Sequence, residues 1–443
     1  MSSCTRSIDW HLMPYLWLLY MFCVVDRVNI GLARVINYTD DQGQMERDLG
    51  MSPGQYNWAV SIFYVGYILF EVPSNLMLHY FSPRIWISRI AITWGICASC
   101  MAAVHNVAGM YTSRIFLGLF EAGLVPGISY YLSTWYRKQE LGFRMGLFFS
   151  AASFASALGG LLAFVISHLD GKLNLSGWRW IFLLEGLPSI VLGILGYWML
   201  PNNPSEARFL NDQDRIECME RLLFDDESEE SDSTRPEEPP ISYLLKDLTL
   251  WGCMICFLGL VAPGAGIAVF LATILKEGGL TGFQAQLYTC PPTILAGLST
   301  IFTCLSSDKF NDQFYHLITW ISIALSCMFS MNFVSQFYVK YLLLTVAMSG
   351  MASSMPLLLV WASDKFLTKK HKLIAMALIV SFGNIGGALS GHIYRQDDAP
   401  DYVRGHFIVA GCLLVALFGC ILTTFNHMKK KVHVKRIQDL NSN

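Results

Sequence analysis

Long apolar stretches separated by short polar segments run along the whole chain. A bilayer core of about 30 Å needs about 20 apolar residues in a helix that rises about 1.5 Å per residue. One long polar segment, Pro201 to Lys246, divides these stretches into two groups of six. The pattern predicts an all-α integral membrane protein with twelve transmembrane helices in two six-helix halves. The expected helices cover residues 12–36, 56–80, 84–105, 109–135, 143–168, 179–200, 249–275, 284–305, 314–334, 338–361, 372–394 and 403–427.

The same pattern sets the expected domain boundaries. We expect an N-terminal six-helix bundle at 1–200, a linker at 201–248, a C-terminal six-helix bundle at 249–428 and a basic tail at 429–443. The linker contains an acidic run followed by the prolines around Pro236 to Pro240. High charge density and proline favour a flexible segment in its middle.

The two halves show weak internal similarity. Aligning Pro126 in the fourth expected helix with Pro356 in the tenth puts two helices of similar length in register. Arg114 and Glu121 then fall opposite apolar residues of the tenth helix. In this register the ionisable residues that are expected to act in function lie in the N-terminal half.

Lysine and arginine are unevenly distributed among the short loops. They concentrate on the side of the N-terminus, and a further basic cluster follows the last helix. Basic residues of short loops stay cytoplasmic. We therefore expect both termini and the linker in the cytoplasm, in a multi-pass protein of the plasma membrane. The basic loop residues are Arg84, Arg137, Lys138, Arg144, Lys309, Lys365, Lys369, Lys370 and Lys372.

The composition agrees with a lipid environment and narrows the function. The chain is 53% hydrophobic and 14% charged, whereas soluble domains carry about 25% charged residues. The net charge of −2 supplies no basic stripe for a nucleic-acid partner. The histidines form no cluster with acidic residues, and the closely spaced cysteine pairs lie in apolar segments. We expect no enzymatic activity, no metal site and no cofactor beyond a coupling proton.

Ionisable residues inside the predicted helices are the candidates for function. Such a residue costs at least about 2.5–3.5 kcal/mol on insertion, so it faces the bundle interior or a cavity. The first, second, fourth and sixth helices contain them, whereas the seventh, eighth and ninth contain none. The candidates are Asp26, Arg27 and Asn29 in the first helix, Glu71 in the second, Arg114 and Glu121 in the fourth, and Arg179 and Glu185 in the sixth.

Two arginines are the expected substrate contacts. The helical rise puts Arg27 about 22 Å above the inner end of its helix and Arg114 about 6–7 Å below the outer surface, so the two share one level. The planar guanidinium suits a carboxylate or phosphate. Asn29 and Asn384 are the further expected substrate contacts. We predict an anion-binding site at these residues.

Glu121 is the expected proton carrier. It lies two turns deeper than Arg114 on the same helical face, and an anion at the arginines would change its affinity for a proton. Asp26 is the second candidate for proton coupling. The remaining charged residues are expected to act in gating or structural ion pairs: Glu71, Arg179, Glu185 and Asp308.

The segment from Ser113 to Tyr136, with Arg114, Glu121 and Pro126, resembles the anion:cation symporter family of the major facilitator superfamily, in its fungal allantoate-permease-like subgroup. The motifs beginning at Asp26, Phe70, Gly177 and Asn384 match as well. The resemblance implies the major facilitator fold. It also implies transport of allantoate, nicotinate or a related small carboxylate with protons, using Arg27, Arg114 and Glu121.

These observations favour a secondary active transporter that imports a small organic anion as a monomer in the lipid bilayer. The alternative is a nutrient-sensing receptor on a transporter fold, without net flux. Long cytoplasmic tails would favour the receptor, and the tails here are short.

Overall fold

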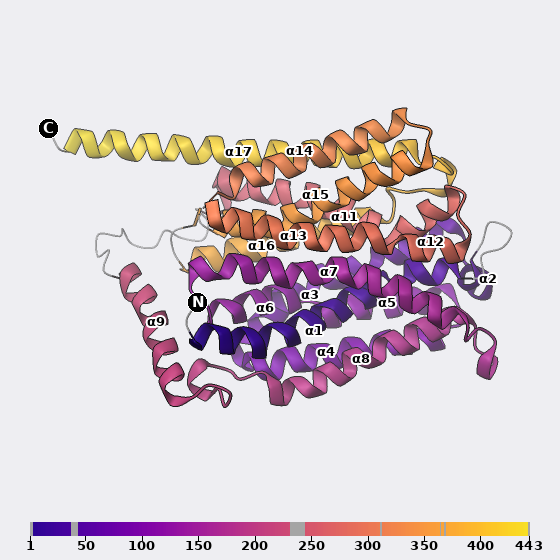
Figure 1. The fold of residues 1–443 in the computed structure, drawn as a ribbon, viewed down its shortest axis with the longest axis horizontal. Coiled ribbons are helices and arrows are strands. Elements are labelled where there is room, and N and C mark those ends of the chain that lie inside the picture. Colours follow the sequence, from indigo (N-terminus) through magenta and orange to yellow (C-terminus); the bar gives the residue numbers. More distant parts are fainter. Residues whose placement is uncertain are drawn as a thin grey trace.

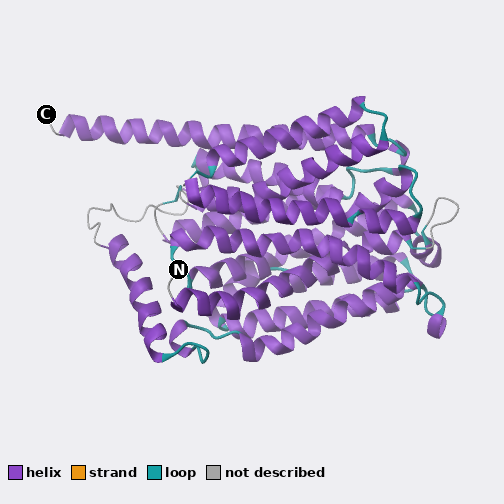
Figure 2. Cartoon of the chain, in the orientation of Figure 1, coloured by secondary structure: helices purple, strands orange, loops and turns teal. Residues whose placement is uncertain are grey.

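The chain is built from helices and loops. The computed structural model describes residues 3–36, 43–230, 244–310, 312–363, 365–366 and 369–441. Within those ranges no residue adopts a strand (Figure 2). The expectation of an all-α membrane fold is confirmed.

The two halves each provide six membrane crossings. The helices of the N-terminal half are α1 (Ser3–Val35), α2 (Gln44–Leu49), α3 (Pro53–Tyr80), α4 (Pro83–Cys100), α5 (Val107–Glu121), α6 (Leu124–Ser133), α7 (Lys138–Ser167) and α8 (Gly177–Met199). Next comes α9 (Asp212–Glu230) in the linker. The helices of the C-terminal half are α11 (Leu248–Glu277), α12 (Gly282–Tyr288), α13 (Cys290–Phe310), α14 (Phe314–Ser330), α15 (Phe337–Ser363), α16 (Lys369–Ser390) and α17 (Val403–Asn441).

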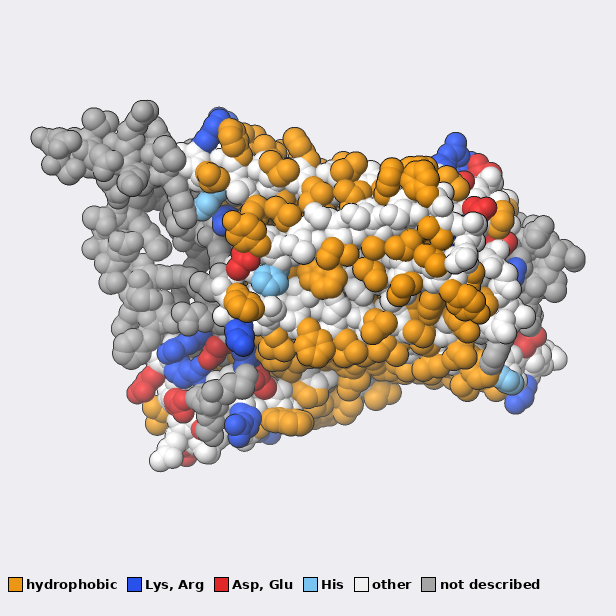
Figure 3. Space-filling view, turned by 45° about the horizontal axis from the view of Figure 1, so that its top comes forward, with side chains coloured by type: hydrophobic (Ala, Val, Ile, Leu, Met, Phe, Trp, Pro, Cys, Tyr) orange, Lys and Arg blue, Asp and Glu red, His pale blue; other side chains and the backbone are white. Residues whose placement is uncertain are grey.

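The lengths and surface of these helices suit a bilayer. Among the described residues, ten helical spans are long and apolar enough to cross a membrane. The 28-residue α3 and the 22-residue α16, with its apolar part Ile374–Ser390, complete twelve crossings. Hydrophobic side chains cover the middle of the visible face, and charged side chains gather at its two ends (Figure 3). This banding is the surface that lipid requires, because a bilayer interior cannot solvate charge.

The two halves lie side by side along their helices (Figure 1). α7 packs on α13, α3 on α16 and α1 on α11, so each of these contacts joins one half to the other. Small residues permit the close approach. A Cβ on Gly31 of α1 would stand 2.2 Å from the Val269 carbonyl oxygen of α11, so only glycine fits there.

The fourth crossing differs from the expectation of one continuous helix at 109–135. α5 ends at Glu121, and α6 begins at Leu124. Gly123 between them adopts φ 86°, a conformation that favours glycine. The break leaves Glu121 at the last turn of α5, which periodicity alone did not indicate.

The ends of the chain are also more helical than expected. α1 begins at Ser3 and includes the polar residues before 12, while α17 continues through the basic tail to Asn441. In the linker, α9 packs against α1, so its first part is ordered; the proline cluster lies outside the described residues. Both ends of the chain and α9 lie at one end of the molecule (Figure 1).

Candidate functional site

Arg27 and Glu121 form the centre of the candidate site. The Arg27 Nε donates a hydrogen bond of 3.0 Å to Glu121 Oε1, and Nη2 donates to the same oxygen. The Cys23 thiol contacts that oxygen at 3.1 Å. The Glu121 side chain is fully buried, whereas Arg27 remains 18% exposed. One member of this ion pair is therefore accessible, and the other is shielded behind it.

Aromatic rings of α3 line the Arg27 guanidinium. Its Cζ lies 5.2 Å from the ring centroid of Phe63 and 5.1 Å from that of Tyr67. Rings at this distance attract a cation through their negative faces. Phe63 and Tyr67 are four residues apart, so they share one face of α3. That spacing was the available sequence signal for Phe63, which the sequence interpretation missed.

Arg114 lies behind Arg27 rather than beside Glu121. Its Nε donates to the Ala59 carbonyl oxygen at 3.2 Å, and Nη1 and Nη2 lie 3.4 and 3.3 Å from the Arg27 carbonyl oxygen. Its side chain is 1% exposed. The two arginines are close, as their predicted depth required, but Arg114 forms no ion pair with Glu121. Arg114 suits a positioning role, because its guanidinium group bonds α5 to the backbones of α1 and α3.

Asp26 points away from Arg27, although the two are adjacent in sequence. Asp26 Oδ2 accepts hydrogen bonds from Trp94 Nε1 at 3.1 Å and from Ser189 Oγ at 2.7 Å. Asp26 and Asn29 are both fully buried. They lie between α1, α4 and α8, on a face of α1 different from that of Arg27. Asp26 therefore forms no ion pair with Arg27, because successive residues of a helix point about 100° apart.

Glu71 and Asn384 meet across the two halves. Glu71 Oε2 accepts from Ser381 Oγ at 2.9 Å and from Asn384 Nδ2 at 3.4 Å. Glu71 belongs to α3 and the other two residues belong to α16. Ser381, three residues before Asn384, was missed in the sequence. The contact joins α3 of one half to α16 of the other, and the gating role of Glu71 stays a prediction.

The four residues predicted to act in gating or structural ion pairs form no ion pair in the described part of the chain. Glu71 bonds to neutral groups, and Glu185 has no hydrogen-bond partner that meets geometric criteria. Arg179 donates to the Ala102 carbonyl oxygen at 2.6 Å and stacks on a tryptophan. Asp308 of α13 lies against the N-terminal turn of α7, where a Cβ on Gly142 would stand 2.6 Å from its Oδ1. A helix N-terminus attracts a carboxylate through its dipole, so charge pairing is not required.

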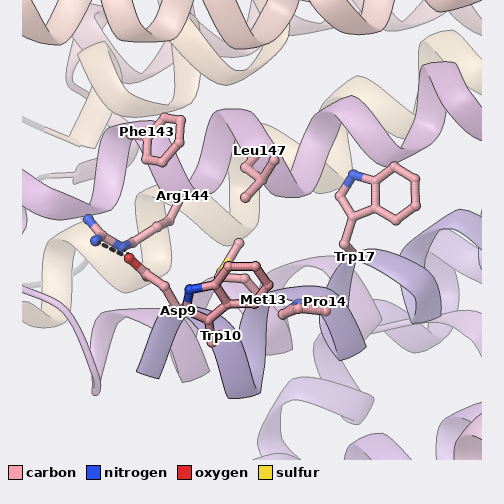
Figure 4. Close-up of a pocket in the computed structure, with 8 residues that line it drawn as sticks. All are labelled: Asp9, Trp10, Met13, Pro14, Trp17, Phe143, Arg144 and Leu147. Atoms are coloured by element: carbon pink, nitrogen blue, oxygen red, sulfur yellow. Dashed lines mark hydrogen bonds and ion pairs between the residues drawn. The ribbon is translucent and has the colours of Figure 1, made fainter. Parts of the chain in front are cut away.

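A second charged pair lies at the end of the molecule that holds the chain termini. Arg144 Nε and Nη2 donate to Asp9 Oδ1 and Oδ2 at 2.8 and 2.7 Å (Figure 4). The pair connects α7 to α1 beside a cavity of about 270 Å³ whose other walls, including Met13 and Phe143, are apolar. This two-pronged geometry is the strongest form of a carboxylate–guanidinium contact. It stabilises the packing of two helices of the same half.

Metal chemistry finds no support in the described ranges. No group of three or more His, Cys, Asp or Glu side chains lies close enough there to hold a metal ion. The cysteines are free thiols, and most of them are buried in helix contacts.

Fold and site together define a polytopic membrane protein with two six-helix halves and a buried charged cluster in the first half. The model of the Major Facilitator Superfamily matches residues 16–391. The chain belongs to this superfamily of membrane transporters, whose members carry small molecules.

Relatives of similar length agree with that assignment. The MFS transporter prlL of a fungal species (strain NRRL 50135) is 31% identical over 95% of this chain and 86% of its own length. A protein of Agrobacterium vitis whose name proposes tartrate transport is 31% identical over 93% of this chain and 92% of its own. The crystal structure of a D-xylose-proton symporter superposes with a TM-score of 0.66 at 15% identity, over 93% of this chain and 97% of that one. This last similarity shows the fold alone.

Proposed function

We propose that this chain imports a small organic anion by proton symport, with alternating access of the site between the two halves. The carrying observation is the accessible guanidinium of Arg27, which is paired with the fully buried carboxylate of Glu121. A guanidinium binds a substrate carboxylate with the same geometry that it offers to glutamate. A substrate anion and Glu121 therefore compete for Arg27.

The competition couples the anion to a proton. When a substrate carboxylate engages Arg27, Glu121 loses its cationic partner in a buried position. A buried carboxylate without a partner favours its neutral form. Glu121 then takes up a proton, and each binding event favours the other. Arg114 cannot replace the lost partner, because its guanidinium is committed to the carbonyl oxygens of Ala59 and Arg27.

The proposed substrate class is a small carboxylate such as allantoate, nicotinate or a related vitamin or nitrogen compound, as in the allantoate-permease-like subgroup. A relative named for tartrate supports a carboxylate. The rings of Phe63 and Tyr67 beside Arg27 would also suit a planar heterocycle.

Uptake of a panel of radiolabelled carboxylates tests the function. Cells expressing the protein should accumulate at least one of allantoate, nicotinate and tartrate above control cells, and acid outside should increase the rate. A protonophore should abolish accumulation. Specific binding of a panel member without any flux, in reconstituted vesicles, would instead identify a nutrient-sensing receptor and refute the importer.

We also propose that both termini and the linker lie in the cytoplasm, in the plasma membrane. Basic residues of short loops, among them Arg84, Arg137 and Arg144, lie at the end of the bundle that contains the termini, which supports this orientation. A tag inserted at Ser231 should be labelled by antibody only after the cells are permeabilised. Labelling of intact cells would reverse the orientation.

A further inference from the structure

A buried polar contact between α1 and α8 lies outside the Arg27–Glu121 pair. Asp26 accepts from Ser189 at 2.7 Å. The two helices run in opposite directions, so the residue one turn further along α1, Asn29, lies beside the residue one turn earlier on α8, Glu185. The Glu185 carboxyl lies within electrostatic range of Asp26 and close to the side-chain amide of Asn29, which can donate to it. The two carboxyl groups are therefore neighbours on adjacent helical turns.

Neither carboxyl group has a charged partner. Asp26 is 0% exposed and Glu185 is 1% exposed. Asp26 Oδ1 and both oxygens of Glu185 lack a hydrogen-bond partner that meets geometric criteria, and no basic side chain of the described chain lies within 4 Å of either group. Asp26 Oδ2 keeps its two hydrogen bonds from Trp94 and Ser189. Two ionised carboxylates in such a place would still lose hydration at the three other oxygens and would repel each other. A carboxyl group that retains its proton avoids both costs.

The surrounding elements add no compensating cation at contact distance. α1 contributes the Cys23 thiol, α4 contributes Cys97, and α5 contributes Glu121, all within electrostatic range of Asp26. The nearest guanidinium on α1, that of Arg27, is occupied by Glu121. α7 presents apolar side chains to this region, including Leu158 and Leu162. Arg114 of α5 lies within electrostatic range of Cys97, but its guanidinium bonds to the carbonyl oxygens of Ala59 and Arg27. The groups that bond to the pair are therefore neutral.

We propose that Asp26 and Glu185 form a proton-binding carboxyl pair, which holds a proton at neutral pH and is separate from the Arg27–Glu121 ion pair. The proposal deepens the proton coupling proposed above and rests on it for any part that this proton plays in transport. The presence of the proton itself does not depend on a substrate. Glu121 bonds to the Arg27 guanidinium, whereas neither carboxyl group of the pair contacts a cation, so the two sites differ in their electrostatic surroundings.

Glu185 is the member of the pair that lies closer to the surface of the bundle. It lines a cavity of about 370 Å³ between α1, α7 and α8, whose other walls are apolar. Val165 on the rim is 62% exposed, so the cavity reaches the outside of the bundle.

Infrared spectroscopy of the purified protein tests the pair directly, with no substrate present. The wild-type spectrum at neutral pH minus that of the double variant D26N/E185Q should contain a C=O stretching band of a protonated carboxylic acid, which shifts to lower frequency in D₂O. E121Q is the matched control and should retain the band, because Glu121 lies in the ion pair with Arg27 and outside the Asp26–Glu185 pair. A difference spectrum without the band, or loss of the band in E121Q, overturns the proposal.

Thermal unfolding provides a second measurement, and the single variant E185Q serves if the double variant does not fold. The unfolded chain releases a proton that the folded pair retains, so the Tm of wild type relative to the variant should fall as pH rises from about 5 to 8. A Tm difference that is independent of pH contradicts the pair. Neither measurement uses transport, so both outcomes would stand even if the proposed anion import were refuted. Refutation of the carboxyl pair would likewise leave the proposed import unaffected.

Discussion

The two halves share an architecture but satisfy their buried polar groups in different ways. In the C-terminal half, buried hydroxyls donate to carbonyl oxygens of their own helix: Thr293 to Thr289 at 2.9 Å, Thr300 to Ala296 at 2.9 Å, and Ser349 to Thr345 at 2.9 Å. In the N-terminal half, the charged groups bond between helices: Arg27 of α1 to Glu121 of α5, and Asp26 of α1 to Ser189 of α8. These three hydroxyls are satisfied within their own helices, whereas the N-terminal charges depend on how helices are arranged.

The equivalent helices of the two halves show the same difference. The fourth crossing is interrupted between α5 and α6 directly after Glu121, while α15 continues without interruption through Pro356. Charge in the first half therefore coincides with an irregular helix, and the matching position of the second half is apolar and regular. We infer that the first half binds the anion and the proton and that the second half lines the site.

The largest effect is expected at Arg27. Arg27→Ala removes the accessible cation and leaves Glu121 buried without its partner, a loss of about 2–5 kcal/mol for such pairs. Uptake of the transported carboxylate should fall by about 100-fold or more. Arg27→Lys should be nearly as defective, because an ammonium does not reproduce the guanidinium fork.

The matched control for Arg27 is Ser349→Ala in the second half, whose hydroxyl bonds only within its own helix. It should transport at close to the wild-type rate. All three variants should be compared at equal surface expression. Wild-type affinity in Arg27→Ala protein, or a defect in Ser349→Ala protein as large as that of Arg27→Ala, would remove the assigned difference between the halves.

A smaller and more selective effect is expected at Glu121. Glu121→Gln imitates the protonated carboxyl and should keep exchange of substrate across the membrane, but lose accumulation against a gradient and most of the pH dependence. Reconstituted vesicles with and without an imposed proton gradient measure both properties. If the gradient drives wild-type uptake and still drives the variant, Asp26 becomes the coupling residue.

Arg114 should affect stability more than substrate affinity. Arg114→Leu removes the donors that join α5 to the Ala59 and Arg27 backbones, and hydrogen bonds from charged donors contribute about 1.5–3 kcal/mol. The Tm should fall, while the KM of the folded fraction changes little. Leu344→Met, at the equivalent buried position of the second half, is the control and should cost less than about 1.5 kcal/mol. Unchanged Tm with lost affinity would make Arg114 a direct substrate contact.

The smallest effect is expected at the surface pair of the second half. Lys340 Nζ lies 2.7 Å from Asp401 Oδ1, and the hydrogen bond and charge of Lys340 lower the pKa of Asp401. The pair is solvent-exposed, so it contributes less than about 1 kcal/mol. Because the pKa is lower in the folded chain, this contribution is present above the ordinary aspartate pKa of about 4 and is lost as pH falls below it.

Thermal unfolding of Asp401→Asn and wild type across acidic pH checks this sign. The Tm of wild type should exceed that of the variant slightly at neutral pH, and the two should converge in acid. A difference that grows in acid would contradict the direction of the shift. High salt should reduce the difference at neutral pH, unlike any effect of Arg27.

The sequence alone determined the crossings, their division into six and six, and the concentration of charge in the first half. Whether a stretch of residues crosses the bilayer depends on the summed cost of placing its side chains in lipid. That sum follows from the stretch itself and does not require knowing which helices pack beside it. The similar depth of Arg27 and Arg114 also followed, because helical rise converts sequence position into depth.

Only the tertiary structure decided which groups meet. Arg27 rather than Arg114 pairs with Glu121, Asp26 turns toward α8, and Glu71 reaches Ser381 in the other half. Each outcome depends on the rotation of one helix against another, which is set by close contacts such as that of Gly31 with the Val269 carbonyl oxygen. The depth of a residue follows from its own helix alone. Its bonding partner depends on how two helices pack together, and that packing leaves no periodic pattern in the sequence.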